Sequence, residues 1–163
     1  MNTDCVTVTT VLAVDPATAF AVFTNEIAAW WRPRVGGLFQ RGRNGALKFD
    51  NGRLLEIYSQ GEPFEIGRVL AWDPAKRLVF EWRQEGFLPG ERTEVDVTFE
   101  AASGGTRVTV RHRGWDALAA DHAARHGFTG NAFISMIGLR WGDVLTALRF
   151  LPLAKPELGS AAI

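Results

Sequence analysis

Hydrophobic and polar residues alternate along several short stretches of the chain, as expected of half-buried β-strands. The clearest stretch is 93–102, where Val95, Val97 and Phe99 alternate with acidic residues and threonine. Such alternation is typical of an antiparallel sheet with one face on a core and the other toward solvent. With the enrichment of β-branched residues as a second criterion, we expect strands at 5–14, 46–50, 53–59, 65–72, 77–84, 93–102 and 106–113.

Helical spacing of apolar residues replaces the alternation at two places. The first begins at Asp15-Pro16, where an aspartate can cap free amides and proline suits the first helical position. We expect two short helices here, broken near Thr24-Asn25. The longest helical pattern covers 131–151 and presents one broad apolar face.

The predicted order is one strand, two short helices, six strands and a long helix. Neighbouring strands joined by short connections imply an antiparallel sheet, and the terminal helix can bury its apolar face only against that sheet. We therefore predict an α+β helix-grip fold, a curved antiparallel sheet wrapped around a long C-terminal helix. It should form a single domain over residues 1–163, with its core in 5–151. A space between the sheet and the helix is a natural site for a pocket.

The long helix also carries a stripe of small residues, Ser135, Gly138 and Gly142, beside its apolar face. Each glycine in a helix costs about 1 kcal/mol relative to alanine. Close packing against the sheet is one explanation, and room for a ligand or a partner helix is the other.

The aromatic content changes the picture of the interior. The chain has six tryptophans and eleven phenylalanines but a single tyrosine, which favours a thick apolar interior with few polar handles. These rings either fill the core or line a ligand cavity. The predicted ligand-binding residues, the pool from which a lining would come, are Trp31, Phe39, Phe49, Ile57, Trp72, Phe80, Trp82, Phe99, Trp115, Phe133, Ile137 and Trp141.

The charge balance narrows the classes of partner. Lys plus Arg and Asp plus Glu each number 18, so no global field would attract nucleic acid or an anionic membrane. No apolar run approaches the roughly 20 residues of a membrane span, so we expect no membrane insertion. The N-terminus has no feature of a secretory signal, and Cys5 is the one cysteine. We expect a cytoplasmic protein, with the oligomeric state open and a homodimer as one alternative.

Metal and cofactor sites are not expected. His122 and His126 are four residues apart and would share a face if 116–126 formed a helix, but a third ligand is missing. The alternative for 116–126, which is rich in alanine, is an irregular cover. The segment 36–45 is rich in glycine and arginine without a phosphate-loop spacing. We expect a solvated loop there, in which Arg41 and Arg43 could meet an anionic ligand at a pocket mouth.

Acid–base catalysis is the enzymatic alternative. Strict alternation predicts that Glu56 and Glu81 point to the outer face of the sheet, whereas Arg68 stays an unplaced polar candidate. His112 is in phase with Val108 and Val110 and could face inward near the end of its strand. We assign no catalytic residue: His112 is retained only as a candidate base, and a hydrogen-bonded residue at the rim is the interpretation that we favour.

Several local motifs together carry a resemblance to a known family. They are Asp15-Pro16-Ala17-Thr18-Ala19-Phe20, Trp30-Trp31, Gly67-Arg68-Val69-Leu70-Ala71-Trp72-Asp73-Pro74, Arg77-Leu78-Val79-Phe80-Glu81-Trp82, Thr109-Val110-Arg111-His112 and Gly114-Trp115, followed by the amphipathic C-terminal helix. Over residues 5–151 the chain resembles the family of the activator of Hsp90 ATPase homologue domain. That family lies in the helix-grip superfamily of START domains and the birch-pollen allergen fold.

The resemblance implies a fold and a set of functions. Members are expected to bind small hydrophobic ligands or to act as stress-related, co-chaperone-like modules, and relatives by fold act as polyketide cyclases or dehydratases. The chain shows no Hsp90-binding N-terminal module, so we do not expect a true Hsp90 co-chaperone. We expect non-catalytic binding of a small hydrophobic or aromatic molecule, with a cyclase-like enzyme and a protein-interaction module as the alternatives.

Overall fold

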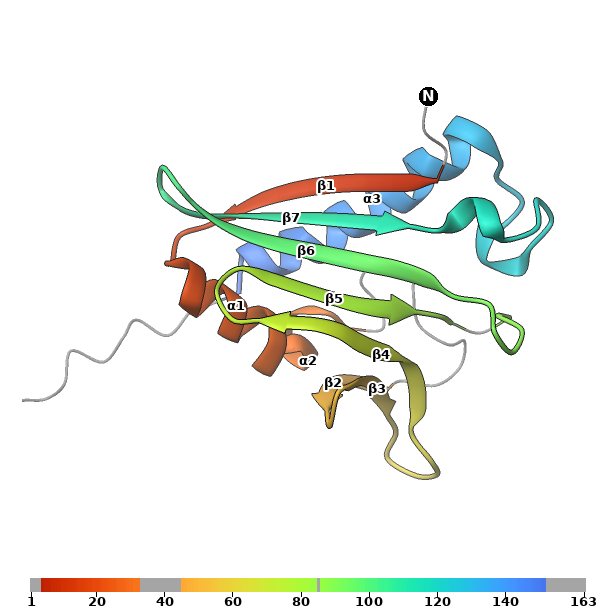
Figure 1. Ribbon diagram of the computed structural model, residues 1–163, viewed down its shortest axis with the longest axis horizontal. Helices are drawn as coiled ribbons and strands as arrows, with labels where there is room; N and C mark the ends of the chain where they lie inside the picture. The colour runs from red at the N-terminus through yellow and green to blue at the C-terminus, as the bar shows by residue number, and fades with distance from the viewer. Residues whose placement is uncertain (1–3, 33–44, 85, 152–163) are drawn as a thin grey trace, which may run out of the picture.

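The computed structural model describes residues 4–32, 45–84 and 86–151 (Figure 1). The strands are β1 (Cys5–Leu12), β2 (Ala46–Asp50), β3 (Arg53–Ile57), β4 (Phe64–Asp73), β5 (Arg77–Trp82), β6 (Thr93–Ala102) and β7 (Gly105–Arg113). The helices are α1 (Pro16–Asn25), α2 (Ile27–Trp30) and α3 (Gly130–Arg149), with short 3₁₀ helices η1 (Trp115–Ala117) and η2 (Ala123–Arg125). Every predicted strand and helix is found, and 116–126 takes the irregular form.

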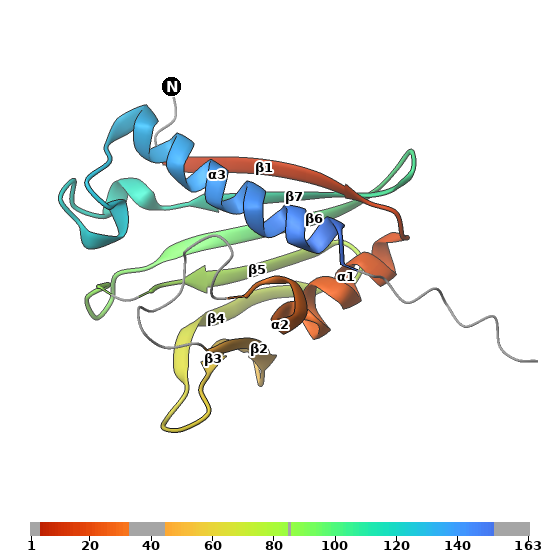
Figure 2. The same ribbon diagram turned by 180° about the vertical axis from the view of Figure 1, so that it is seen from behind.

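The strands form one antiparallel sheet in the order β1-β7-β6-β5-β4-β3-β2. Strands β2 to β7 follow their sequence order, and β1 joins the far edge beside β7. The helices α1, α2 and α3 all lie on one face of the curved sheet, and α3 crosses it obliquely (Figure 2). The predicted α+β fold with its curved sheet and C-terminal helix is confirmed.

Local signals in the sequence define the start of α1 and the turn between β2 and β3. Asp15 caps α1, since its Oδ1 accepts a hydrogen bond of 2.8 Å from the amide of Thr18. Asn51 and Gly52 both have positive φ, 49° and 74°, which is the backbone of a two-residue hairpin turn between β2 and β3. Helix α1 therefore begins, and the β2–β3 hairpin turns, at defined points.

The core lies between the sheet and the helices and is built mainly of aromatic rings. Ten rings are at most 4 % exposed: Phe20, Phe23, Trp30, Trp31, Phe80, Trp82, Phe99, Trp115, Phe133 and Trp141. Aromatic side chains carry a large apolar area each, so this cluster supplies much of the burial that stabilises the fold.

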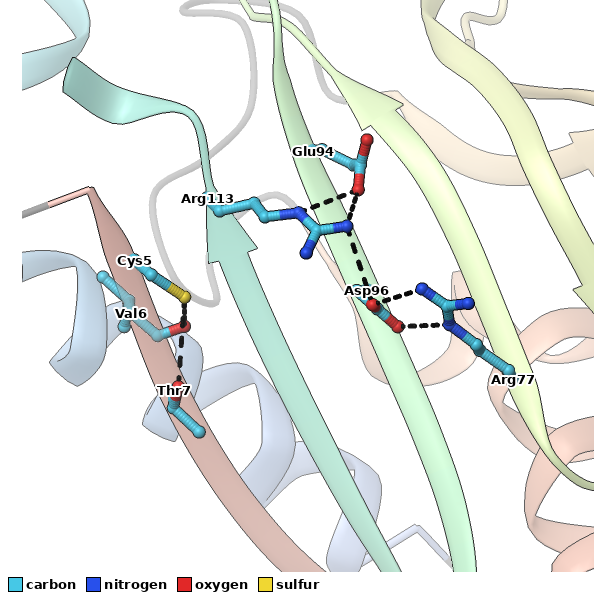
Figure 3. Close-up of polar contacts among 7 residues, drawn as sticks. All are labelled: Cys5, Val6, Thr7, Arg77, Glu94, Asp96 and Arg113. Carbon is cyan, nitrogen blue, oxygen red and sulfur yellow. Dashed lines mark hydrogen bonds and ion pairs between the residues drawn. The ribbon is translucent and has the colours of Figure 1, made fainter. Parts of the chain in front are cut away.

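No helix of the described residues covers the other face of the sheet (Figure 1). This face carries charged side chains. Asp96 on β6 accepts two hydrogen bonds from Arg77, of 3.0 and 2.7 Å, and lies 3.8 Å from Arg113. Arg113 also pairs with Glu94 (Figure 3). Cross-strand ion pairs of this kind let one face of the sheet stay in water. Within the described ranges, no helix combines the length and apolarity that crossing a membrane requires.

Candidate functional site

A pocket of about 760 Å³ lies between the end of α1, the start of α2 and the β2–β3 hairpin. Its apolar wall comes from Ile27, Leu47, Phe49, Ile57, Val69 and Trp72. Pockets of this volume and composition suit a drug-sized molecule. The hairpin positions the site because β2 is the edge strand among the described strands, so none of them pairs with its outer side.

Trp72 is the largest side chain on the pocket wall and is 46 % exposed. Two phenylalanine rings hold its indole by edge-to-face contacts. Phe20 of α1 lies 5.3 Å away, centroid to centroid, at 90°, and Phe49 of β2 lies 5.7 Å away at 73°. Such T-shaped pairs are favourable and fix the orientation of the ring. The indole is therefore held in place while nearly half of it remains accessible.

Most polar side chains of the pocket are exposed, and so are its apolar residues Ile57 and Trp72. Asn25, Lys48, Asp50 and Asn51 are exposed, whereas Ile27 and Leu47 are buried. Thr24 is buried, but its hydroxyl already donates a hydrogen bond of 2.8 Å to the carbonyl oxygen of Phe20. The pocket thus has a buried floor that includes Ile27 and Leu47, and a rim on which polar side chains lie beside Ile57 and Trp72.

The predicted lining residues fall into two groups. Phe49, Ile57 and Trp72 line the pocket. Trp31, Phe80, Trp82, Phe99, Trp115, Phe133, Ile137 and Trp141 lie in the interior instead, each at most 4 % exposed. Phe39, like Arg41 and Arg43, lies outside the described residues. Sequence reasoning missed Ile27, Leu47 and Val69. The one available signal was that Leu47 lies two residues before Phe49, and therefore on the same face of the predicted strand.

The interior rings contact one another in the space between the sheet and α3. Trp31 stacks on Trp82 with centroids 5.1 Å apart and planes 5° from parallel, and it lies 4.9 Å from Trp141. Trp115 packs edge-on against Phe133 at 5.0 Å. The region where the curvature of the sheet predicted a pocket is thus occupied by these side chains, and the open pocket lies beside the hairpin.

His112 of β7 faces inward and is fully buried among these rings, so the favoured position at the rim is wrong, although the residue is hydrogen-bonded as expected. Its Nδ1 accepts a hydrogen bond of 3.0 Å from Trp141, so the proton is on Nε2, which donates to the hydroxyl of Thr93 at 2.7 Å. That hydroxyl donates to the carbonyl oxygen of Trp82 at 3.1 Å. Burial lowers the pKa of His112 to about 3. Both ring nitrogens are therefore engaged, and the imidazole is neutral.

The prediction that Glu56 points to the outer face is wrong. Glu56 is 1 % exposed and lies directly opposite Leu47 in the β2–β3 pairing, and Leu47 belongs to the core. Cross-strand partners share a face, so Glu56 is on the core side, where Tyr58 donates a hydrogen bond of 2.8 Å to its Oε2. The adjacent pair Leu54-Leu55 made the phase of this strand ambiguous. Glu81 is partly exposed and pairs with Arg92 at 3.2 Å.

The two remaining histidines do not share a helix face, which corrects the helical alternative. His122 precedes η2, where its Nδ1 accepts from the amide of Ala124 at 3.1 Å and its Nε2 donates to Glu91 at 2.8 Å. His126 follows η2 in the left-handed conformation. In the part of the chain that the structure describes, no three His, Cys, Asp or Glu side chains gather closely enough to hold a metal ion.

Comparison with known proteins places these features in a family. The sequence profile of the Activator of Hsp90 ATPase homolog 1-like protein family matches residues 13–132. No curated protein matches the chain significantly in sequence.

Solved structures share the fold at low sequence identity. A protein from Chromobacterium violaceum is 17% identical with a TM-score of 0.59, covering 91% of this chain and 96% of its own. The Aha1 dimer from Colwellia psychrerythraea is 15% identical with a TM-score of 0.54, and the match covers 89% of this chain and 92% of that chain. DynU16, a protein of the dynemicin biosynthetic locus, is 18% identical with a TM-score of 0.61, covering 90% of this chain and 46% of that one. These likenesses show the fold.

Proposed function

The chain belongs to the family of Activator of Hsp90 ATPase homolog 1-like proteins, and we propose that it binds a small hydrophobic, aromatic molecule without transforming it. The binding site is the pocket between α1, α2 and the β2–β3 hairpin. The observation that carries this proposal is Trp72, a large ring held by two neighbours and still 46 % exposed on a pocket of about 760 Å³.

Burial of apolar area supplies the driving force for binding. Covering the exposed part of Trp72 and its neighbours contributes about 25 cal/mol for each Å² removed from water. The side chains are already oriented by packing, so little conformational entropy is lost when a ligand docks. Polar side chains on the rim face solvent, which fits a ligand with an apolar body and a polar end.

Two features support a binder over a cyclase-like enzyme. Acid–base chemistry requires a group with a free lone pair or proton within reach of the substrate. Both nitrogens of His112 are engaged with Trp141 and Thr93, and the residue is fully buried. Thr24, the buried hydroxyl of the pocket, is also hydrogen-bonded, to a backbone carbonyl.

A fluorescence titration with N-phenyl-1-naphthylamine, an uncharged aromatic probe, tests the proposal. We expect saturable binding to the wild-type chain. Trp72→Leu keeps an apolar side chain but removes the aromatic face, and it should weaken binding about three- to ten-fold. The control is Leu139→Ala on α3, where Leu139 is 73 % exposed and not part of the pocket. Absence of saturable binding, or equal weakening by both variants, would contradict the proposal.

The assembly state and location are separate proposals. Aha1 from Colwellia psychrerythraea was solved as a dimer, and a homodimer of this chain is the corresponding alternative to a monomer of 18.0 kDa. Light scattering of the purified protein distinguishes the two. We propose a cytoplasmic location, which cell fractionation tests.

A further inference from the structure

The charged residues that line the pocket do not balance. Lys48, Asp50 and Arg53 all belong to the β2–β3 hairpin, giving two positive charges and one negative. Asp50 lies directly opposite Arg53 in the pairing of the two strands. Neighbouring charges of opposite sign offset each other, so Asp50 offsets one of the two positive charges. The three residues leave one net positive charge on the pocket wall.

Arg53 forms an ion pair with Glu65, whereas Lys48 forms none among the described residues. Glu65 of β4 lies 3.8 Å from Arg68 and 4.0 Å from Arg53, so its carboxylate is shared by two arginines. Among the described residues, no carboxylate lies within 4.0 Å of the Lys48 ammonium group. A lysine side chain is long and flexible, so its ammonium group can reach a ligand at the pocket mouth.

We propose that the ligand of this pocket is an aromatic acid. Its planar ring system stacks on the exposed indole of Trp72, and its anionic group faces Lys48 at the rim. This inference rests on the proposed function, because it specifies the ligand class of the same pocket. A cationic ligand would meet the repulsion of Lys48, and a neutral ligand would gain nothing from it.

Two probes with a common skeleton isolate the anionic group. 8-Anilinonaphthalene-1-sulfonate is the N-phenyl-naphthylamine skeleton with one sulfonate added, and N-phenyl-1-naphthylamine lacks the charge. Lys48→Met keeps the length and apolar character of the side chain and removes its charge. For an exposed charge pair, we expect this variant to weaken sulfonate binding about two- to five-fold at low salt. Binding of the uncharged probe should not change.

The matched control is Arg107→Met, which removes one positive charge from β7, a strand well separated from β2 in the sheet order. It should change the affinity for neither probe. Added salt should reduce the difference between wild type and Lys48→Met, because exposed charges are screened. Trp72→Leu should weaken binding of both probes, which shows that they occupy this pocket.

The possible outcomes separate the two proposals. If neither probe binds saturably, the proposed function itself fails. If Trp72→Leu weakens binding of the uncharged probe, the pocket is supported as the binding site. If Lys48→Met then leaves sulfonate binding unchanged, or weakens the binding of both probes equally, the aromatic acid is rejected as the ligand class. Selective loss of sulfonate affinity in Lys48→Met alone supports the inference.

Discussion

The indole N–H of Trp141, on α3, donates a hydrogen bond of 3.0 Å to Nδ1 of His112, on β7. This bond requires a neutral imidazole, because a protonated Nδ1 would be a second donor facing the first. The contact therefore joins α3 to β7 only while the imidazole is neutral. Acid should weaken the attachment of α3.

The first prediction concerns the pH dependence of stability. The pKa of His112 is about 3 in the folded protein and about 6.5 in an unfolded chain. Between these values the unfolded chain binds one more proton, so the free energy of unfolding falls as the pH is lowered. The His112 contribution is fully present above about pH 6.5 and is lost at up to about 1.4 kcal/mol per pH unit below it. Urea denaturation at a series of pH values measures this change in the free energy of unfolding.

A His112→Gln variant supplies the reference for this measurement. It is less stable overall, but its free energy of unfolding should depend less steeply on pH between about 5 and 6.5 than that of the wild type. Asp15 and Glu91, whose pKa values are lowered by hydrogen bonds to Thr18 and to Leu88, titrate at lower pH and stay outside this window. Identical slopes for the two proteins would rule out the buried neutral histidine.

The second prediction uses the tryptophans as reporters. Trp72 is 46 % exposed, whereas the other five are at most 1 % exposed. Acrylamide should therefore quench one component of the fluorescence and leave the rest protected. Trp72→Phe should remove the quenchable component without changing the protected one. If a comparable quenchable component persists in Trp72→Phe, another tryptophan is accessible and the assignment of the pocket wall is wrong.

The third prediction contrasts two glycines. A Cβ at Gly67, on β4, would lie 1.8 Å from the carbonyl oxygen of Glu81, so Gly67→Ala must push two strands apart and should cost about 3 kcal/mol of stability. A Cβ at Gly142, on α3, would meet no atom within 4 Å. Gly142→Ala should therefore raise the stability by about 0.5–1 kcal/mol through helix propensity.

Thermal or urea unfolding of the two glycine variants gives the comparison directly. Destabilisation by Gly142→Ala would mean that α3 needs the open surface at this position. The open space at Gly142 already contradicts close packing against the sheet as the explanation of the small residue at that position. At Gly138 the nearest side-chain atom, Cγ1 of Val6, would be 3.7 Å from a Cβ, an ordinary contact.

The fourth prediction concerns the outer face of the sheet. The Asp96 side chain is 8 % exposed and contacts both Arg77 and Arg113, whereas the Glu94 side chain is 30 % exposed. Asp96→Asn should cost about 2 kcal/mol, since it weakens charge-assisted hydrogen bonds that are shielded from water. Glu94→Gln should cost less than about 1 kcal/mol. Urea denaturation measures the loss in free energy of unfolding for each variant. Equal losses for Asp96→Asn and Glu94→Gln would show that burial of Asp96 has no energetic consequence.

The sequence predicted the architecture well because its signals are local and strong. Alternation along β6 and the apolar face of α3 each extend over many residues, and Asp15 with Pro16 defines a helix start. The inward direction of His112 followed from its phase with Val110. These features depend on neighbours along the chain, which sequence patterns record directly.

The candidate site was less accessible from sequence. The phase of β3 depends on which residue of β2 it pairs with, and the pairing of Leu47 with Glu56 is a contact between strands. Whether a ring such as Trp31 or Trp72 is buried depends on the packing of α1 and α3 against the sheet. Aromatic composition therefore predicted the rings of the interior but could not distinguish those that face the pocket.

The location of the pocket on the edge hairpin has an evolutionary consequence. Most of its wall comes from β2, β3 and the junction of α1 and α2, while the ring cluster under α3 is supplied largely by other strands and by α3 itself. If the pocket binds the proposed ligand, substitutions of exposed hairpin residues such as Lys48 and Ile57 would change its specificity while leaving the ring cluster under α3 intact. Ligand specificity could then diverge on a common scaffold.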